Sequence, residues 1–471
     1  MVKRLAIFGG SFNPPAIHHR IIAEALIDHF DEIVVVPCGP RPDKSTTNDV
    51  EPIHRATMVD LTFRGLAKVR VELFDLELST FTYTYKLDER FHPEGEIWHV
   101  ITVDLIKGGK LGQSTIQRSW ERGEDIWQNL NFAIIVQHDY DYDPADLPLK
   151  HKIFKVDQAG ASSIIREKIF KRESIEGLVL PEVANYIKRY GLYRVTLLTR
   201  AAKFNLKEPR LLIDLDERNP ESKELAKSFQ HLASDNPNCI LVIGGDGTML
   251  HSIRKYWRLR LPFLGINTGH RGFLLNGIDE LTEGELPNAD LILRHSPLLY
   301  LETCNESNSD WHCAYAFTDA WVERARSQTA WIEVKINGDV RIPKLISDGV
   351  LVATAAGSTA YARSMGATPL LVETPAVILV GSNVMEPPNW KSVLLSLDTH
   401  IEFTALNYEK RPLNGYADGE FLGMVTQMRV RISRIAAVEL AFSPRHDMAQ
   451  KISELQFPKY TSIVDTKEFK P

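Results

Sequence analysis

Apolar residues form short, β-branched runs in the first part of the chain, separated by turns and helix-like segments. The runs Arg4–Phe8, Ile33–Val36 and Phe132–Val136 are typical of strands that are buried on both faces of a parallel sheet. Ile21–Phe30, which lies before the second run, is helix-like. The alternation of strands and helices predicts an α/β fold.

A second α/β pattern begins after a helix signal near the middle of the chain. Pro181–Tyr190 reads as a helix that Gly191 ends, and Arg194–Leu198 reads as a new opening strand. We therefore place a domain boundary near Tyr193. The predicted domains are residues 1–193 and 194–471, and the second divides into an α/β nucleotide-binding part (194–289) and a mainly β-rich part (290–471).

The β-rich part is predicted from a change in the pattern. From about Asp290 the strands are expected to shorten and to alternate between apolar and polar residues. Trp331–Val340 reads as a hairpin around Asn337-Gly338, because this dipeptide favours the tight turn between antiparallel strands.

Composition narrows the classes of function. The chain has 471 residues, 44% hydrophobic and 25% charged, with a net charge of −6, so neither nucleic acid nor a membrane surface is an expected partner. The apolar stretch that starts the chain ends at Gly9-Gly10 and is too short for a secretory signal. We expect a cytoplasmic protein with reduced thiols, because none of the cysteines form a Cys-x-x-Cys pair. They are Cys38, Cys239, Cys304 and Cys313.

The most informative segment is the glycine-rich turn Gly244–Thr248. It follows Cys239–Ile243, which reads as a buried strand, and precedes Met249–Trp257, which reads as a helix. A glycine turn at a helix N-terminus presents backbone N–H groups to an anion such as phosphate. Asp246 places a carboxylate in the same turn, where it is costly unless it takes a proton from a hydroxyl or holds a metal ion. This combination predicts a kinase that phosphorylates an alcohol; the alternative for Asp246 is a helix N-cap.

The first strand also ends in a glycine turn. Gly9–Pro15 follows that strand, and His18 and His19 open the next helix. An imidazole in this position can donate a hydrogen bond to a polyphosphate and stabilise its transition state. The alternative is a tight turn with a capping histidine.

A set of motifs follows in a fixed order: Gly9–Pro14, Pro42-Asp43-Lys44, Arg55 with Met58, Thr82-Tyr83-Thr84, Asp104 with Trp120 and Trp127, Ala161–Arg166, and Leu180–Ile187 with Leu192-Tyr193. On these motifs, residues 1 to about 193 resemble the nicotinate and nicotinamide mononucleotide adenylyltransferases.

This resemblance implies a Rossmann-like nucleotidyltransferase domain. His19 would be catalytic at the ATP phosphates, which Lys44 and Arg166 would also bind. Thr82, Tyr83 and Asp104 would line the mononucleotide or ATP-ribose sites. For Lys44, Tyr83 and Arg166 the alternatives are a solvated loop charge, a core aromatic and a helix-surface residue. The remaining residues that we expect to bind nucleotide are Gly9, Ser11, Phe12, His18, Ser162 and Ser163.

The chain departs from the family pattern at two stations. Where the family has His-x-Gly-His, this chain has Ala16-Ile17-His18-His19, so one imidazole is missing and a side chain replaces a glycine. His18 could supply the missing imidazole or could block the nucleotide. Thr102 replaces the glycine of the family's Gly-x-Asp.

Six stations follow one another in the second part of the chain: Gly244–Thr248, Asn267–Leu274, Thr318-Asp319, Asp348-Gly349, Gly357–Tyr361 and Asp418-Gly419. On these stations, residues from about 194 to 471 are similar to NAD kinases. The Gly-Ser-Thr-Ala-Tyr station separates these enzymes from other kinases that share Gly-Gly-Asp-Gly-Thr.

By this resemblance Asp246 would be the general base on the adenosine ribose 2′-hydroxyl. The other residues would cradle phosphates or bind the dinucleotide, and for Tyr361 the alternative is core packing. They are Gly245, Gly247, Thr248, Asn267, Phe273, Thr318, Asp319, Asp348, Ser358, Thr359, Ala360, Tyr361 and Asp418.

Some stations differ from the kinase pattern. Thr318-Asp319 stands for Asn-Glu, Thr354–Gly357 stands for Thr-Pro-Thr-Gly, and Arg271 replaces a leucine. We expect these changes to alter substrate affinity or donor preference more than the type of reaction.

The sequence therefore predicts a bifunctional enzyme of pyridine-nucleotide synthesis that uses ATP, NAD and Mg²⁺, with the metal ion bridging phosphates rather than held by protein ligands. Small-molecule nucleotides are its expected partners, and self-association into a homo-oligomer is expected by analogy. Two alternatives stay open. The first half could be a catalytically degenerate nucleotide-binding or regulatory module, or the whole chain could be a non-catalytic NAD sensor.

Overall fold

The computed structural model describes residues 2–41, 50–137, 141–156, 161–193, 201–269, 272–281, 284, 286–305 and 308–457. The chain forms two compact units. The first contains Met1–Thr199 with the short segments Arg258–Arg260 and Arg434–Ala436, and the second contains the rest of the chain. The predicted strand Arg194–Leu198 lies outside the described residues.

The first unit is built on a fully parallel sheet whose strand order is β3-β2-β1-β4-β5-β6. This order reverses between β1 and β4, and the carboxyl ends of strands on either side of such a reversal form the usual ligand crevice of an open α/β sheet. The three predicted strands of this unit are confirmed. The strands are β1 (Arg4–Gly10), β2 (Glu32–Pro37), β3 (Val69–Val71), β4 (Glu96–Thr102), β5 (Asn131–Gln137) and β6 (His151–Val156).

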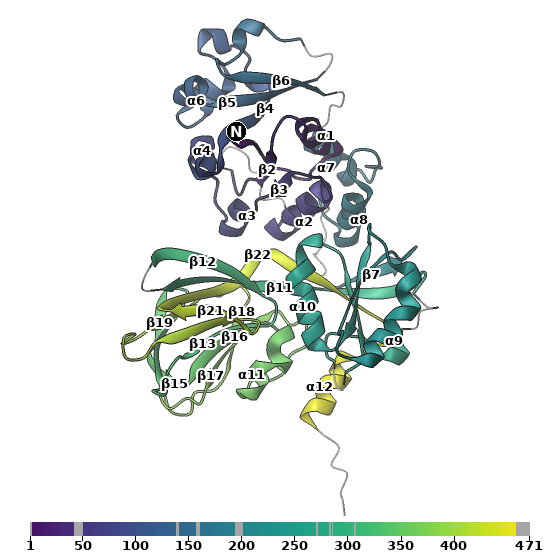
Figure 1. Ribbon diagram of the computed structural model, residues 1–471, viewed down its shortest axis with the longest axis vertical. Coiled ribbons are helices and arrows are strands. Elements are labelled where there is room, and N and C mark those ends of the chain that lie inside the picture. Colours follow the sequence, from purple (N-terminus) through teal and green to yellow (C-terminus); the bar gives the residue numbers. More distant parts are fainter. Residues whose placement is uncertain are drawn as a thin grey trace, which may run out of the picture. The chain divides into compact units, whose positions relative to one another are not determined.

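Helices cover both faces of this sheet, as Figure 1 shows. Along β1, Ala6 and Phe8 pack with the side chains of α1 and α2, whereas Leu5 and Ile7 pack with α4. The helices are α1 (Ile17–Leu26), α2 (Pro52–Phe63), α3 (Phe74–Leu78), α4 (Thr84–Phe91), η2 (His92–Glu94), η3 (Val103–Leu105), η4 (Gly109–Leu111), α5 (Thr115–Ser119), α6 (Gly123–Asn129), η5 (Pro144–Asp146), α7 (Ser162–Phe170) and α8 (Pro181–Tyr190).

The predicted bounds of the first helix are wrong. Ile21–Phe30 was expected from its apolar periodicity, but α1 begins at Ile17 and ends at Leu26. The early start has a local cause, because Ala16 is extended and its backbone N–H donates to the Nδ1 atom of His19 at 2.9 Å. The last predicted helix is confirmed, and Gly191 ends it with a φ of 61°.

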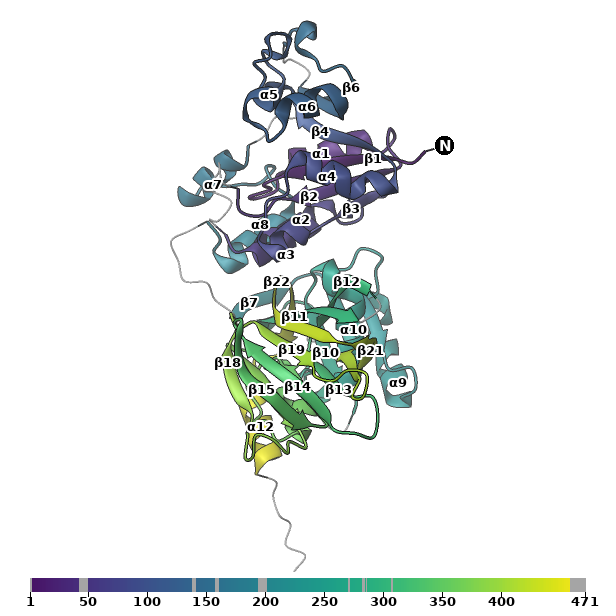
Figure 2. The same ribbon diagram turned by 90° about the vertical axis from the view of Figure 1, so that its left-hand side faces the viewer.

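The second unit contains a ten-stranded mixed sheet. Parallel strands β8, β9 and β10 form its α/β part, and β10 also pairs in parallel with the end of β22. Figure 2 shows β11 and β22 running side by side as an antiparallel pair. The strands are β7 (Ala201–Leu206), β8 (Leu211–Leu215), β9 (Cys239–Gly244), β10 (Phe263–Asn267), β11 (Ala289–Asn305), β12 (Asn308–Ala316), β14 (Ala330–Ile336), β15 (Asp339–Ser347), β19 (Ile401–Ala405) and β22 (Gln427–Phe442).

The expectation of short strands after Asp290 is wrong for two of them. β11 has 17 residues and β22 has 16, and their pairing shifts register between Pro297 and Leu299. The irregularity bends the pair, so that its two halves join the α/β strands and the β-rich strands in one sheet. The predicted hairpin is confirmed: Asn337 and Gly338 have φ values of 53° and 86° between β14 and β15.

A second sheet of six antiparallel strands completes the β-rich region, with the order β18-β17-β16-β13-β20-β21. Its buried side chains pack with those of β11, β14 and β19 in one apolar core. The strands are β13 (Asp319–Arg324), β16 (Gly349–Ala353), β17 (Ala376–Ser382), β18 (Val393–Ser396), β20 (Leu413–Ala417) and β21 (Glu420–Val425).

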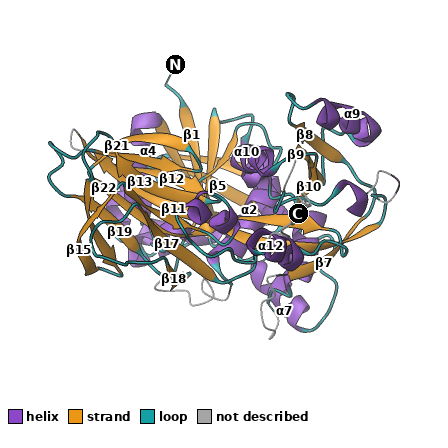
Figure 3. Cartoon of the chain, turned by 90° about the horizontal axis from the view of Figure 1, so that it is seen from below, coloured by secondary structure: helices purple, strands orange, loops and turns teal. Residues whose placement is uncertain are grey.

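Strands β8 and β9 lie between helices α9 and α10 in Figure 3, away from the strands β15, β19 and β21. The predicted helix Met249–Trp257 begins earlier than expected, at Asp246. The last three residues of the glycine-rich segment Gly244–Thr248 form the first turn of this helix. Among the described residues, no helix is long and apolar enough to cross a bilayer. The remaining helices are α9 (Pro220–Phe229), η6 (Gln230–Leu232), α10 (Asp246–Tyr256), η7 (Trp257–Leu259), η8 (Ile278–Glu280), η10 (Ala356–Thr359), α11 (Tyr361–Ser364) and α12 (Met448–Gln456).

Candidate active sites

Asp246 occupies the first helical position of α10, and only Gly245 separates it from the end of the buried strand β9. It is not the N-cap of this helix, because Gly245 holds that position and no side chain caps it. The carboxylate instead accepts backbone N–H groups from a neighbouring turn. Phe273 N lies 3.0 Å from both Oδ1 and Oδ2, and Leu274 N lies 2.9 Å from Oδ1. Two amides on a separate segment therefore set the direction of this carboxylate.

The electrostatic surroundings of Asp246 act in opposite directions. Burial raises the pKa of its carboxyl above the usual range, since it removes water from the charged form. The amides of Phe273 and Leu274 and the charge of Lys451 oppose this rise in pKa. The result is a half-buried carboxyl with a raised pKa, which makes it a better proton acceptor than an exposed aspartate.

The Gly244–Thr248 and Asn267–Leu274 stations are neighbours because β9 and β10 pair in parallel. Thr268 N donates to Gly244 O at 2.9 Å, and an added Cβ on Gly269 would lie 3.8 Å from Gly245 Cα. Gly244 is packed so closely that a Cβ would lie 2.4 Å from the Thr248 hydroxyl oxygen. This crowding explains the need for glycine where the strand meets the helix.

A second polar cluster joins the Thr318-Asp319 and Asp418 stations on β13 and after β20. The Asp418 carboxylate accepts Phe317 N at 2.6 Å and both Thr318 N and Thr318 Oγ1 at 2.7 and 2.6 Å. Its bonds thus tie the turn after β20 to the start of β13. Burial and the negative charge of Asp418 raise the pKa of Asp319 to about 7.

Helix α10 links the two clusters. Its first residue is Asp246, and Arg254 near its other end donates to Asp418 O at 3.1 Å and to the Glu420 carboxylate at 2.7 Å. One helix of 11 residues therefore contacts both groups of predicted stations.

The remaining kinase stations divide between a cleft and a buried turn. Asp348 and Tyr361 line a polar cleft of about 620 Å³, together with Trp321, whose ring makes an edge contact with Tyr361 at 5.3 Å between centroids. Asp348 accepts hydrogen bonds from Arg324 at 2.6 Å and from Asn383 at 2.7 Å. Tyr361 is 39% exposed, so it is not a core residue.

The Gly-Ser-Thr-Ala station forms the turn that leads into α11. The Ser358 side chain is fully buried, and its hydroxyl donates to Ala355 O at 2.6 Å. Thr359 is half-buried and Ala360 is exposed. Within this station, Thr359 and Ala360 are therefore more accessible to a ligand than Ser358.

The sequence analysis missed two residues near the turn that holds Asp246. Asn276 is fully buried, and its amide donates to Gly265 O at 2.9 Å and to Ala441 O at 3.1 Å while accepting Ser443 N at 2.8 Å. Lys451 of α12 donates to Gly272 O and Leu275 O at 3.1 Å each. A polar residue directly after two leucines was the only signal for Asn276, and Lys451 had none, because it lies far along the chain from Asp246.

In the first unit, the loop after β1 and the start of α1 bring the predicted histidines together. Phe12 is buried, and its ring centroid lies 4.9 Å from that of His19. The rings of His18 and His19 are 4.0 Å apart. Burial lowers the pKa of His18 below the usual range, so its imidazole is neutral near pH 7. Gly9 is a paired residue near the end of β1, and Ser11 directly follows this strand.

Helix α7 reaches the same loop from the other end of the domain sequence. Arg166 donates to Asn13 O at 2.6 Å, and Ser162 donates to Pro14 O at 2.8 Å. The next residue, Ser163, is exposed. The structure therefore places α7 beside the loop between β1 and α1.

The other stations of the first unit are more dispersed. Thr82 donates through its backbone and its hydroxyl to Asp75 at 3.0 and 2.6 Å, and Tyr83 packs edge-on against Phe81. Asp104 is exposed in η3, immediately after β4. Lys44 lies outside the described residues.

The described residues contain no group of three or more His, Cys, Asp or Glu side chains that could hold a metal ion.

Family models match both parts of the chain. Residues 7–168 match the cytidylyltransferase-like family, and residues 173–283 match the ATP-NAD kinase N-terminal domain. The NAD kinase of Rickettsia akari is 31% identical over 235 residues, covering 50% of this chain and 91% of that protein. The NAD kinase of Rickettsia typhi is 32% identical over 237 residues, with the same coverage. Among solved structures, a yeast NADH kinase complexed with NADH aligns with a TM-score of 0.47 at 17% identity, covering 55% of this chain and 90% of that one.

Two nucleotide-handling domains of the transferase class thus follow one another in this molecule, and a β-rich region completes the second. The chain belongs to the NAD kinase family and carries a cytidylyltransferase-like domain ahead of the kinase domain.

Proposed function

We propose that the second unit transfers the γ-phosphoryl group of ATP to the 2′-hydroxyl of the adenosine ribose of NAD, which gives NADP. The observation that carries the proposal is the Asp246 carboxylate, oriented by the amides of Phe273 and Leu274 at the N-terminus of α10. The relatives named as NAD kinases support the choice of NAD as the substrate.

The two oxygens of Asp246 differ in their environment. Oδ1 accepts both amides, whereas Oδ2 shares the Phe273 N–H and accepts no other hydrogen bond from the described residues. Oδ2 is thus the oxygen available to a substrate hydroxyl. It would take the 2′-OH proton as the ribose oxygen bonds to the γ-phosphorus and the bond from that phosphorus to the ADP oxygen breaks.

Other groups would bind the polyphosphate and the dinucleotide. The N–H groups at the start of α10 point toward the turn and favour an anion there, as helix N-termini do. Mg²⁺ bound to the phosphate oxygens would supply charge neutralisation at the transferred group. Asp348 and Tyr361 in the cleft of about 620 Å³ would contact the dinucleotide.

We also propose that the first unit transfers AMP from ATP to nicotinamide or nicotinate mononucleotide and releases pyrophosphate. His19 Nδ1 accepts the Ala16 N–H, so the ring proton of the neutral imidazole lies on Nε2. That proton can be donated to a phosphate oxygen. If the two reactions are sequential, nicotinamide mononucleotide is the expected substrate, because the nicotinate product must be amidated before the kinase uses it.

A second candidate function for the first unit is a nucleotide-binding module without transfer activity. It is favoured by Ala16, which contributes only its backbone N–H to the histidine turn, and by the half-buried ring that His18 adds where a glycine is expected. Loss of one preorganised donor costs about 10²–10³ in rate, which would make transfer slow but measurable.

One product assay on the full chain tests both units. NAD with ATP should give NADP, and either mononucleotide with ATP should give a dinucleotide and pyrophosphate. Failure to form NADP would refute the kinase proposal and favour a non-catalytic NAD sensor. NADP formation without dinucleotide formation would favour the module. A clear preference for the nicotinate mononucleotide would remove the sequential order.

A further inference from the structure

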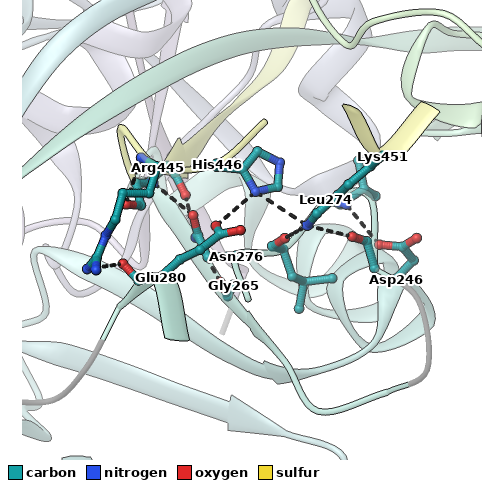
Figure 4. Close-up of polar contacts among 12 residues, drawn as sticks. Asp246, Gly265, Leu274, Asn276, Glu280, Arg445, His446 and Lys451 are labelled. Carbon is teal, nitrogen blue, oxygen red and sulfur yellow. Dashed lines mark hydrogen bonds and ion pairs between the residues drawn. The ribbon is translucent and has the colours of Figure 1, made fainter. Parts of the chain in front are cut away.

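Lys451 belongs to α12, the last helix in the described part of the chain, and contacts the turn that holds Asp246. Its ammonium group donates to Gly272 O and to Leu275 O at 3.1 Å each. These carbonyls flank Phe273 and Leu274, whose amides hold the Asp246 carboxylate. Figure 4 shows Leu274, whose N–H donates to the Asp246 carboxylate, with the Lys451 ammonium group beside the same turn.

The same turn is fixed on its other side by backbone and amide bonds. Asn276 N donates to Gly265 O, and Asn267 N donates to Asn276 O, so the segment after Leu275 pairs with β10. The segment that carries the two amides is therefore anchored on one side by β10 and on the other by Lys451.

We propose that Lys451 is a positioning residue of the kinase centre, which acts on the Asp246 carboxylate through the turn that it clamps. The inference rests on the proposed kinase function of the second unit. Lys451 needs no contact with substrate for this role, because its two bonds fix the direction of the amides that orient Asp246.

The charge of Lys451 has a second effect on the same carboxylate. It opposes the rise in the pKa of Asp246 that burial causes, as do the Phe273 and Leu274 amides. Burial lowers the pKa of Lys451 itself, and the charges of Glu280 and Asp246 oppose that change. Lys451 thus affects both the orientation of the Asp246 carboxylate and the pKa of its carboxyl group.

The neighbouring groups form a chain of contacts that extends away from the turn (Figure 4). His446 Nδ1 lies 3.1 Å from the Glu280 carboxylate and 3.4 Å from Lys451 Nζ, so it cannot donate to the first and accept from the second at once. Five elements or segments supply the charged and titratable groups around Lys451 and His446. These groups are Asp246 of α10, Glu280 of η8, Arg294 of β11, Arg445 and His446 after β22, and Lys451 of α12.

The test uses the full chain with Lys451→Met and Lys451→Arg, and the exposed Lys227→Met on α9 as the matched control. NADP formation is measured against pH, with kcat and KM determined separately. We expect Lys451→Met to lower kcat about tenfold or more with little change in KM, since it disturbs the base rather than substrate binding. Its kcat should also reach half its maximum at a higher pH than the wild type. Lys451→Arg, which keeps the charge, should restore the wild-type pH midpoint, and Lys227→Met should match the wild type.

A double variant separates positioning from a general loss of structure. In an Asp246→Asn background, Lys451→Met should lower kcat no further, because both changes act on one group. Where Lys451→Met does not fold, Lys451→Gln carries the same expectations. An unmoved pH midpoint, or losses that multiply in the double variant, would overturn the inference while the kinase function stands. Wild-type protein that forms no NADP would overturn both.

Discussion

Replacing Asp246 with asparagine separates the chemistry of this residue from its place in the fold. The substitution is isosteric, and the amide oxygen of the new side chain can take the position of Oδ1, which accepts both Phe273 N and Leu274 N. The new NH₂ group then occupies the Oδ2 position, 3.0 Å from Phe273 N, and one of the two contacts that share this N–H is lost. Because the amide cannot accept a proton, the general base is removed.

The magnitudes follow from these contacts. General-base catalysis contributes about 10²–10⁴ in rate, or about 2.7–5.4 kcal/mol at about 1.36 kcal/mol for each factor of ten. Loss of the contact between Phe273 N and Oδ2 lowers the free energy of unfolding by no more than about 1 kcal/mol. Removing a carboxyl whose pKa is raised in the folded state offsets this cost, since burial of its charged form opposes folding at neutral pH.

The assay measures NADP formation at saturating ATP and NAD beside thermal unfolding of the same samples. We expect kcat to fall at least about 10²-fold, a modest change in the KM for NAD, and a melting temperature within a few degrees of the wild type. Asp290→Asn, on an exposed part of β11, is the control and should change neither quantity. Near-normal kcat in Asp246→Asn would refute the role of this carboxylate, and so would a loss of kcat that only follows unfolding.

Three further perturbations test other parts of the molecule. His19→Ala should lower dinucleotide formation from mononucleotide and ATP about 10²–10³-fold while NADP formation is unchanged; an unaltered rate would argue that the imidazole is only the helix cap seen in its bond to Ala16. Asn276→Ala should lower the free energy of unfolding by about 3 kcal/mol in denaturant titrations, because it removes two buried donors and leaves Ser443 N–H without its acceptor. Asn205→Ala, which also loses two bonds but at an exposed site, is its control, and equal losses for the two would contradict the argument from burial. Because the pKa of Asp319 is raised to about 7, its stabilising contribution is full below the usual carboxyl pKa and is lost as pH rises through about 7. The melting temperature should therefore depend less on pH between these limits in Asp319→Asn, and an unchanged dependence would exclude Asp319 as its source.

Much of the local structure could be predicted from the residues. Asn337-Gly338 defined a hairpin turn, and Gly191 ended a helix, because each requires a positive φ that few other residues adopt. Strands such as Cys239–Ile243 were recognisable because a strand buried on both faces is apolar throughout. The starts of α1 and α10 were missed, since contacts within the turns before them decided where each helix begins.

The sequence alone determined the order of the glycine and acidic stations, the type of most elements, and the presence of a carboxylate in a phosphate-binding turn. Those properties are local, because they depend on backbone freedom and on the spacing of apolar side chains. Only the tertiary structure decided that Phe273 and Leu274 hold Asp246, that Asn276 ties β10 to the end of β22, and that Lys451 closes the turn. These contacts join residues from 11 to 179 positions apart, and the entropy of closing the longest of these loops is recovered only when the whole sheet forms.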